Sequence, residues 1–329
     1  MIDLGYIDLH CDSLLRIYNK YDQDNLLENN KLSVDFKGLK AGGALAQFFA
    51  IFMPDQSTLE ELNLAQIDDD LYIEDLLNIL KNEVKKNNKM IEMAYNYRDL
   101  LNNKNENKIS AFLTIEDGRS VNGDLEKIKK YYELGVRLIT LSWNYENCFG
   151  WPNSDNQEIM KKGLKQFGVE AVKYMNKIGI IIDVSHLSDG GFYDVAEHSE
   201  KPFVASHSNV RSLAANPRNL KDDMITKIAE KGGVIGLNFA PQLLNKNSAD
   251  KRSRLEEMIE HLNYIKNIGG ESVLALGSDF DGIQGDLEIT KSSEMPLLFK
   301  ALKKDGWSDD LIDKFRLENV LRVIKEVLN

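Results

Sequence analysis

Cysteine is scarce in this 329-residue sequence, which contains only Cys11 and Cys148. The two residues are far apart and do not form the short-spaced pair that is typical of a metal site or a redox motif. This scarcity excludes a disulfide-stabilised scaffold and is consistent with a reducing compartment. Long apolar runs are also lacking, because no stretch reaches the roughly 18 uncharged apolar residues that a membrane-spanning helix needs.

Positive charge is in deficit as well. The 41 lysines and arginines stand against 52 aspartates and glutamates, for a net charge of −11. Such a surface repels nucleic acids and anionic membranes, so neither is expected as a partner. The first residues, MIDLGYIDLHCD, lack the basic and apolar segments of a secretion signal, and the final KEVLN is no lipid-anchor signal. We therefore expect a cytoplasmic protein.

What the sequence does contain is a regular alternation of short apolar runs and amphipathic helices, which predicts a parallel β-sheet. With 43% hydrophobic residues, the chain has enough apolar side chains for a large core. Eight runs are expected to be strands, namely residues 6–12, 44–52, 109–116, 136–143, 180–186, 203–208, 234–240 and 273–280. Eight is the strand number of a (β/α)8 TIM barrel, which is the predicted α/β fold; an open doubly wound sheet is the alternative.

Helical patterns occupy the segments between these runs. Leu125, Ile128 and Tyr132 form one apolar stripe. The C-terminal helix is expected to carry another on one face, made of Leu317, Val320, Leu321, Ile324 and Leu328. Residues from about 54 to 108 form a longer, polar, Asn-rich insertion that we interpret as two surface helices. The whole chain, residues 1–329, is therefore expected to be a single barrel domain.

Residues that bind metals or move protons gather at the ends of the predicted strands. Three of the five histidines and three carboxylates occupy such positions: His10, His186, His207, Asp12, Glu116 and Asp279. In a (β/α)8 barrel the carboxyl ends of the strands form the rim on which active sites are built. Six residues of these types on one rim indicate a functional site.

His10 and Asp12 are two residues apart on the first predicted strand, so their side chains are expected to point to the same side. Asp8 would share the barrel interior with them, and Ile7 and Leu9 would face the helices. An imidazole beside a carboxylate makes a two-armed ligand for zinc, which accepts nitrogen and oxygen atoms at about 2 Å. The alternative is a hydrogen-bonded pair that caps the barrel.

Glu116 ends the third predicted strand, in the segment TIEDG. A carboxylate has two oxygens and is able to bridge two metal ions, as two-metal hydrolytic sites require; the alternative is a carboxylate at a helix start. His186 and His207 end consecutive strands, which are neighbours in a barrel, so together with Glu116 they would hold a second metal ion. The remaining candidates are interpreted as structural: Asp117, His198 and His261.

Asp279 ends the last predicted strand, in LGSDFDG, where its carboxylate would take a proton from a metal-bound water. Asp281 is the competing residue, although its FDG context is typical of a turn. Arg211 and Arg218 follow His207 in the same loop. Either arginine would be able to hold a substrate carboxylate through a bidentate pair.

In this order the motifs resemble the membrane dipeptidase (renal dipeptidase) family of the metal-dependent amidohydrolase superfamily. The resemblance extends over nearly the whole chain and rests on DLHCD, IEDG, DVSH, ASHSNVR, NPRNLKDD, GSDFDG and ENVLRVI. It implies a (β/α)8 barrel with two zinc ions that hydrolyses dipeptides by means of a metal-bridging hydroxide. Family resemblance also suggests a homodimer.

The resemblance implies a role for each matching residue. The metal ligands would be His10 and Asp12 for one zinc ion, His186 and His207 for the other, and Glu116 between them. Asp279 would be the general acid and base. The resemblance also favours Arg218 over Arg211 as the residue that binds the carboxylate of the dipeptide.

Two positions depart from the family pattern. Well-known members carry a histidine after the fourth strand that assists the developing oxyanion, and Trp143 stands there in LSWNYEN. An indole N–H donates a hydrogen bond but carries no charge, so we interpret Trp143 as a wall of the substrate pocket. Some members have a tyrosine after the seventh strand, where this chain has Ala240. The alternative functions are hydrolysis of another small amide, such as an N-acyl amino acid or a lactam, and a metal-binding barrel with little activity.

Overall fold

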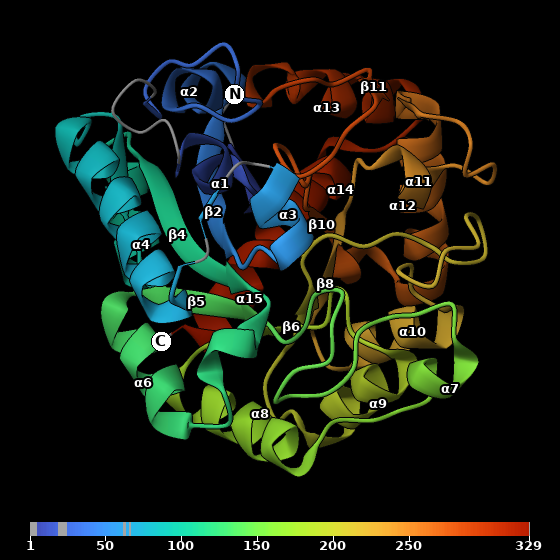
Figure 1. Ribbon diagram of the computed structural model, residues 1–329. Coiled ribbons are helices and arrows are strands. Elements are labelled where there is room, and N and C mark those ends of the chain that lie inside the picture. Colours follow the sequence, from blue (N-terminus) through green and yellow to red (C-terminus); the bar gives the residue numbers. More distant parts are fainter. Residues whose placement is uncertain (1–4, 19–24, 62–63, 66, 329) are drawn as a thin grey trace.

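The computed structural model describes residues 5–18, 25–61, 64–65 and 67–328. Within these ranges eight parallel strands close a barrel that helices surround, which confirms the predicted (β/α)8 fold (Figure 1). The barrel strands are β1 (Tyr6–Cys11), β2 (Ala44–Phe52), β4 (Ile109–Glu116), β5 (Val136–Thr140), β6 (Ile181–Asp183), β7 (Val204–Ala205), β8 (Val234–Leu237) and β10 (Leu274–Leu276). They follow one another around the barrel in chain order, and β10 pairs with β1 to close it.

Each of the eight predicted runs contains one barrel strand, but several strands are shorter than predicted. β7 covers only Val204–Ala205 of the predicted residues 203–208. Three short strands lie outside the barrel ring and were not predicted. They are β3 (Ile91–Met93), which pairs with β4, and β9 (Arg252–Ser253) with β11 (Asp286–Leu287), which pair with each other.

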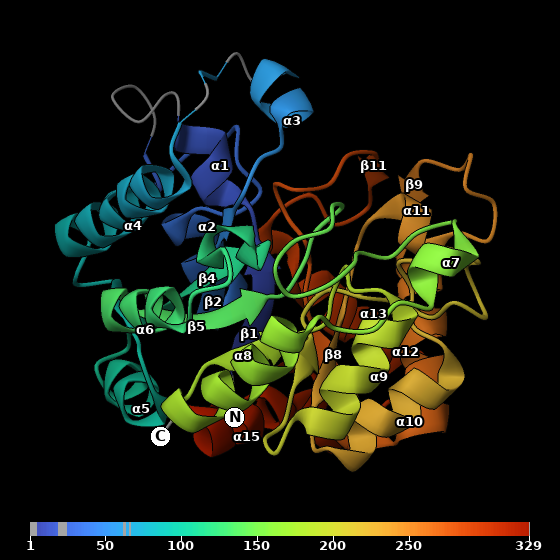
Figure 2. The same ribbon diagram turned by 60° about the horizontal axis from the view of Figure 1, so that its bottom comes forward.

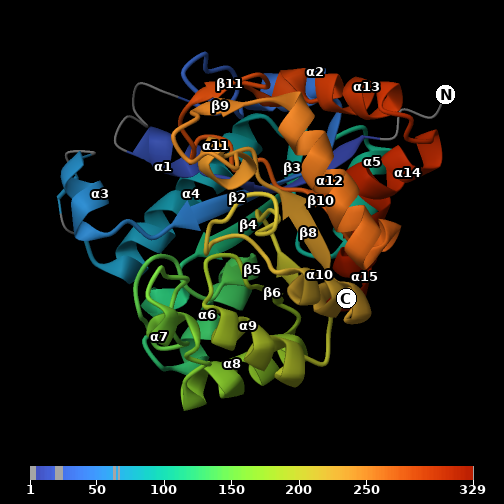
Figure 3. The same cartoon turned by 90° about the vertical axis from the view of Figure 1, so that its right-hand side faces the viewer.

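Helices cover the outside of the barrel, as Figures 2 and 3 show from two further directions. The helices are α1 (Ser13–Tyr18), α2 (Phe36–Gly42), α3 (Gln56–Glu61), α4 (Asp69–Lys86), α5 (Tyr97–Asn105), α6 (Leu125–Leu134), α7 (Gln157–Met160), α8 (Gln166–Ile178), α9 (Asp189–His198), α10 (Asp222–Glu230), α11 (Pro241–Leu244), α12 (Leu255–Gly269), α13 (Pro296–Lys304), α14 (Asp309–Asp313) and α15 (Asn319–Val327). Among the described residues, no helix is both long and apolar enough to cross a membrane.

The segment from 54 to 108 is richer in structure than predicted. It contains α3, α4, β3 and α5 rather than two surface helices. The long helix α4 is not a surface helix either, because Tyr72, Leu76 and Leu80 are buried in the main core. It serves as the helix that connects two neighbouring barrel strands, β2 and β4. The apolar face of α4 was not predicted, because the segment as a whole is polar and Asn-rich.

An apolar layer fills the barrel interior beneath the rim. Phe48 and Phe112 lie opposite each other on β2 and β4 and stack, with ring centroids 4.7 Å apart. They share a strand face with Phe52 and Glu116, which lie four residues closer to the carboxyl ends. α15 packs against this layer from the opposite end with Val320, Val323, Ile324 and Val327. The helix closes this end of the barrel and therefore buries a wider face than predicted. Leu321 is half-buried, whereas the other residues of the predicted stripe are buried.

The first strand does not alternate as predicted. Ile7 and Leu9 belong to the interior layer with Phe48, so the prediction that they face the helices was wrong. The register of β1 against β2 shifts between Asp8 and Cys11. Such an irregularity changes the direction of the side chains that follow it. The shift allows apolar residues to fill the barrel while His10 still reaches the rim.

A close backbone approach brings β7 toward the barrel axis. A Cβ atom on Gly236 would lie 1.9 Å from the Ser206 carbonyl oxygen, and one on Gly277 would lie 1.8 Å from the same atom. Only glycine fits at these two positions. The next residue, His207, thereby stacks on His10 with ring centroids 3.9 Å apart, although β8 and β10 separate their strands.

His261 on α12 makes part of the stability depend on pH. Its Nδ1 accepts a hydrogen bond from Val210 N at 3.1 Å, so its Nε2 carries the proton and donates to Leu244 O at 3.0 Å. Burial lowers the pKa of His261 to about 4.

In the unfolded chain the His261 imidazole takes up a second proton near pH 6.5. The free energy of unfolding should therefore fall as the pH drops from about 6.5 toward 4, by up to roughly 3 kcal/mol. Urea unfolding of metal-free wild type and His261→Gln should show a weaker pH dependence in the variant; parallel curves would contradict this role.

Candidate active site

The carboxyl ends of the strands surround a cavity of about 410 Å³. Four residues of its wall were predicted as ligands or base: Asp12, Glu116, His186 and Asp279. Arg218 and Trp143, the two predicted substrate-binding residues, line the same cavity. His10 and His207 are buried beneath it. The structure therefore brings all eight predicted site residues together at one place.

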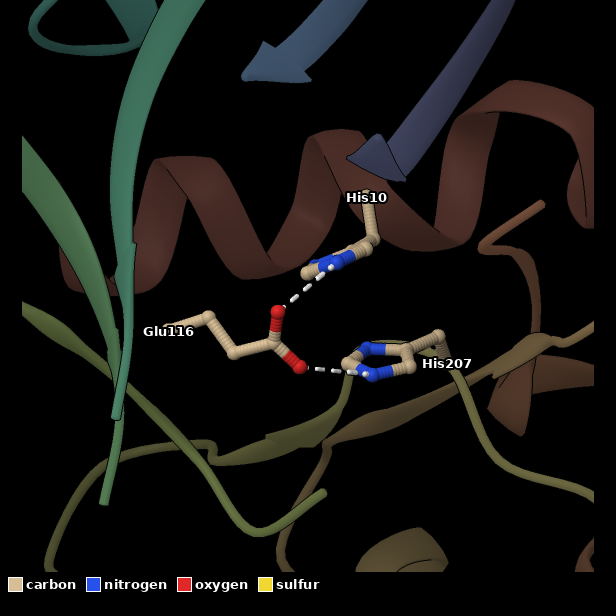
Figure 4. Close-up of side chains that lie close together, drawn as sticks. All are labelled: His10, Glu116 and His207. Atoms are coloured by element: carbon tan, nitrogen blue, oxygen red, sulfur yellow. Dashed lines mark ion pairs between the residues drawn. The ribbon is translucent and has the colours of Figure 1, made fainter. Parts of the chain in front are cut away.

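Glu116 lies between His10 on one side and the pair His186 and His207 on the other. Its Oε2 is 3.5 Å from His10 Nε2, and its Oε1 is 3.1 Å from His186 Nε2 and 3.4 Å from His207 Nε2. Figure 4 shows the carboxylate between the rings of His10 and His207. His186 Nε2 and His207 Nε2 are themselves 3.1 Å apart. Each oxygen of one carboxylate thus faces a different set of nitrogen atoms.

Two further carboxylates lie near His10. Its Nε2 lies 3.4 Å from Asp12 Oδ2 and 3.8 Å from Asp279 Oδ1. The ligand-type atoms of His10, Asp12 and Asp279 lie within 4.8 Å of one another, as do those of His10, Glu116 and His207. The two clusters overlap at His10, so the ligand-type atoms form one continuous group, and each cluster alone is compact enough to hold a divalent ion.

At three of the proposed ligands the electrostatics favour the protonation state that binds a metal ion. Although burial opposes ionisation, His10 and the other two histidines hold the pKa of Glu116 well below its ordinary value. Burial and the Arg218 charge lower the pKa of His186 to about 4. Burial and the nearby His10 also lower the pKa of His207. Carboxylate and neutral imidazole are the forms that coordinate a metal ion. At His10, burial opposes protonation, but the Glu116 and Asp12 carboxylates outweigh it and raise the pKa, so a bound metal ion would have to displace a proton there.

Several of these polar atoms have no hydrogen-bond partner within the described ranges. They are Nδ1 and Nε2 of His10, Oδ1 of Asp12 and Nδ1 of His186. Buried polar atoms are normally paired, so an unpaired group of nitrogen and oxygen ligands requires an explanation. A divalent cation that accepts both atom types supplies one. The residues present therefore fit the metal centre that the sequence predicts.

Left-handed backbone turns aim two of the side chains. His186 has φ 68° and Asp279 has φ 61°, and both follow short strands, β6 and β10. Residues other than glycine adopt this conformation only at a cost, of about 1 kcal/mol or more, and such strain is often found at functional sites. Here it turns each side chain toward the cavity three residues after its strand has ended.

Asp279 and Asp281 have different surroundings. Asn238 Nδ2 donates to Asp279 Oδ2 at 2.8 Å, which leaves Oδ1 directed at the cluster. Burial raises the pKa of Asp279, and the nearby carboxylates raise it further. Asp281 accepts hydrogen bonds from Ser13 Oγ at 2.5 Å and from two backbone N–H groups of residues 33–34. Its carboxylate is thus engaged in holding loops, as the turn interpretation expects.

The two candidate arginines are also distinguished. Arg211 forms a bidentate pair with Asp189, with nitrogen–oxygen distances of 2.9 and 2.8 Å, and is not available to a substrate. Arg218 donates to Ser208 Oγ at 2.6 Å and to His207 O at 2.8 Å. Its buried Nε has no partner in the described part of the chain. Arg218 lines the cavity and keeps one N–H donor that is not engaged by the described residues.

Trp143 stands edge-on to Phe52 at the cavity wall, with ring centroids 4.8 Å apart. Its centroid is 6.2 Å from that of His186. The rings of Phe52 and Trp143 both line the cavity and give it an apolar wall. Ala240 begins α11, where its N–H donates to Asn238 Oδ1 at 2.7 Å. At this position the chain contributes a backbone contact to Asn238 rather than an aromatic hydroxyl.

Sequence reasoning overlooked Asn238. This residue directly follows β8 and binds both Asp279 Oδ2 and, at 3.2 Å, the backbone carbonyl of His207. Its position at a strand end is the signal that would have identified it, since the rim is where site residues gather. Its amide was passed over because amides were not among the residue types sought.

Comparisons with known proteins agree with this geometry. The family model "Membrane dipeptidase (Peptidase family M19)" matches residues 1–329. An uncharacterised protein from the pqqA 5′ region of Klebsiella pneumoniae is 36% identical over 230 residues, 68% of this chain and 84% of its own. An uncharacterised dipeptidase of Schizosaccharomyces pombe is 32% identical over 226 residues, 68% of this chain and 54% of its own.

A solved structure with the same fold covers the whole barrel. It is a metallopeptidase from Rhodobacter sphaeroides, solved with a phosphinate mimic of the dipeptide L-Ala-D-Ala. The TM-score is 0.88 at 24% identity, over 98% of this chain and 99% of the other. This likeness supports the fold, and the family model confirms the resemblance inferred from the motifs. Since the family model extends over the full sequence, the chain belongs to the membrane dipeptidase family, peptidase family M19, and is a metal-dependent hydrolase that acts on dipeptides.

Proposed function

We propose that the protein hydrolyses dipeptides with two zinc ions held by five residues of the barrel rim. The observation that carries this proposal is the position of Glu116, whose two oxygens face separate groups of histidines. The ligands would be His10 and Asp12 for one ion, His186 and His207 for the other, and Glu116 for both. Zinc suits such a mixed set of nitrogen and oxygen atoms. When bound, the two ions would polarise the peptide carbonyl and lower the pKa of the attacking water.

The other residues of the cavity would orient the substrate and move its proton. Arg218 is the cationic group placed to receive the carboxylate of a dipeptide, through its free Nε and the adjoining edge of the guanidinium. Asp279 Oδ1 would accept the proton of the attacking water and deliver it to the leaving amine. Asn238 keeps Oδ1 directed at the cluster by binding Oδ2. Trp143 and Phe52 would exclude water on one side and contact a side chain of the substrate.

Two substitutions should separate metal binding from proton transfer. Glu116→Ala removes the carboxylate that faces both groups of histidines, so it should lose bound metal together with activity. Asp279→Asn should retain about two metal ions per chain and lose activity by about 10² to 10⁴, the usual contribution of a general acid and base. Elemental analysis and kcat on a dipeptide panel measure the two effects. Metal content near zero in zinc-loaded wild type would sink the two-metal proposal, and a fully active Asp279→Asn would remove Asp279 from its role.

Arg218→Lys should raise KM for dipeptides, because a point charge does not reproduce the planar two-pronged contact of a guanidinium. A dipeptide amide, which lacks the carboxylate, should bind wild type more weakly than the free dipeptide does. The variant should distinguish the two ligands far less. Arg211→Lys is the matched control, since Arg211 is paired with Asp189. If both variants kept the wild-type preference for the free dipeptide, the carboxylate would bind elsewhere.

Trp143→Phe tests whether the indole acts as a wall or as a hydrogen-bond donor. The phenyl ring keeps an aromatic face beside Phe52 but removes the N–H. As a wall, Trp143→Phe should change kcat by less than about tenfold, and Trp143→Ala should mainly alter side-chain preference. Loss of a donor to the oxyanion typically costs about 10² to 10³ in rate. A fall of that size in Trp143→Phe, at unchanged KM and metal content, would make the indole catalytic.

A further inference from the structure

Behind His207 lies a buried carboxylate that does not face the cavity. Asp183 ends β6 and is 0% exposed. Its Oδ1 accepts hydrogen bonds from Ser185 N at 3.0 Å and from Ser206 N at 2.8 Å. Its Oδ2 accepts from Thr140 Oγ1 at 2.6 Å and from Ser206 Oγ at 2.5 Å. The four donors occupy about all the lone-pair positions that a carboxylate offers.

The Ser206 hydroxyl links this carboxylate to the imidazole of His207. Ser206 Oγ lies 2.7 Å from His207 Nδ1. A hydroxyl has a single proton, and Ser206 donates it to Asp183. Ser206 Oγ is therefore left with lone pairs only on the side of His207. The contact between them requires that His207 Nδ1 carries a proton and donates it.

We propose that Asp183 acts through Ser206 as a positioning residue that fixes His207 in the Nδ1–H tautomer. This tautomer leaves a free lone pair on Nε2, the atom that lies 3.4 Å from Glu116 Oε1 and 3.1 Å from His186 Nε2. The inference rests on the proposed function in that it takes Nε2 as the metal-binding atom. A hydrogen bond to the remote nitrogen of a metal-binding histidine typically sets its tautomer and orientation.

The other two histidines of the cluster lack such a support. Nδ1 of His10 and Nδ1 of His186 have no hydrogen-bond partner in the described segments. The His207 ring moreover contacts both of the others: it stacks on that of His10, with centroids 3.9 Å apart, and is tilted against that of His186, at 5.2 Å. With its orientation and tautomer fixed, the His207 ring at this central position gives the surrounding proposed ligands a fixed neighbour to pack against.

Asp183→Asn should reverse the direction of the hydrogen-bond chain. The two backbone N–H groups require an acceptor, so the amide oxygen of Asn would take the place of Oδ1. Its NH₂ group would then replace Oδ2 and donate to Ser206 Oγ. The Ser206 proton would turn to His207 Nδ1, since the other hydroxyl within reach, Ser185 Oγ, is farther away at 3.4 Å. His207 would switch to the Nε2–H tautomer, which has no lone pair on Nε2, the proposed metal-binding atom.

Two further variants separate tautomer control from simple loss of structure. Ser206→Ala removes the link but leaves Asp183 in place, so His207 should populate both tautomers. Thr140→Val removes a hydroxyl from the same carboxylate oxygen without touching His207, and it is the matched control. It should lower stability to a similar degree as Ser206→Ala yet leave the tautomer of His207 unchanged.

The tautomer is read directly from the ¹⁵N shifts of the imidazole nitrogens in metal-free, ¹⁵N-histidine-labelled protein. The signals of His207 are identified by their absence in His207→Gln. Zn²⁺ affinity is measured separately by competition with a chromophoric chelator. We expect Nδ1–H in wild type and Thr140→Val, Nε2–H in Asp183→Asn and a mixture in Ser206→Ala. Zn²⁺ affinity should fall by about 10- to 100-fold in Asp183→Asn, by less in Ser206→Ala, and by no more than about twofold in Thr140→Val.

Wild-type His207 in the Nε2–H form, or Ser206→Ala with an unchanged tautomer and unchanged Zn²⁺ affinity, would overturn the proposal. The Ser206→Ala arm decides even if Asp183→Asn fails to fold. Equal losses of Zn²⁺ affinity in Thr140→Val and Ser206→Ala would likewise reject it in favour of a general structural role. Because the tautomer is read without metal, a protein that bound no zinc would refute the proposed function and not this hydrogen-bond chain.

Discussion

The site depends on the placement of one buried carboxylate between three histidines. Glu116 ends β4 and pairs with Phe52, the last residue of β2, at the carboxyl ends of the two strands. Burial of an isolated carboxylate is strongly unfavourable, and a carboxylate surrounded by imidazoles is tolerated because they lower its pKa. The other proposed ligands lie at or just after the carboxyl ends of barrel strands, around this group. The barrel brings these side chains together, and Glu116 is the negatively charged group at their centre.

This convergence demands unusual local geometry from the chain. β7 approaches the axis only because Gly236 and Gly277 leave room for the Ser206 carbonyl, and His186 and Asp279 adopt left-handed backbone conformations. Such features destabilise a fold when they are considered alone. Apolar packing at the other end of the barrel compensates for this loss of stability. There α15 and the interior phenylalanines form a core that takes no part in the site. Stability and chemistry are thus separated along the barrel axis.

Much of this arrangement could be predicted from the sequence, since apolar runs mark strands and strand ends mark the rim. The ligand-type residues and the eight barrel strands were found in this way. The facing of Ile7 and Leu9 could not be found, because strict alternation fails where the register of β1 shifts. Nor could the sequence show that Arg211 is occupied by Asp189, a partner 22 positions away. Asp183 and Ser206 stand in the segments DVSH and ASHSNVR, but their importance lies in hydrogen bonds to other side chains, which the sequence does not show.

The same network also relates the metal ligands to the residue proposed to bind the substrate. Arg218 donates to the backbone carbonyl of His207, and Asn238 binds that same oxygen while it holds Asp279. The proposed carboxylate anchor, a proposed ligand and the proposed base are therefore all tied to one peptide group. A fixed spacing between anchor and metal centre admits a carboxylate only a short distance from the bond to be cut, as in a dipeptide. Ala240, one of the two positions where this chain departs from the family pattern, supports that set through its N–H on Asn238. Trp143, the other, lines the cavity and lies outside the set. It is therefore free to alter the shape of the cavity, and hence side-chain preference, without moving the parts that define the reaction.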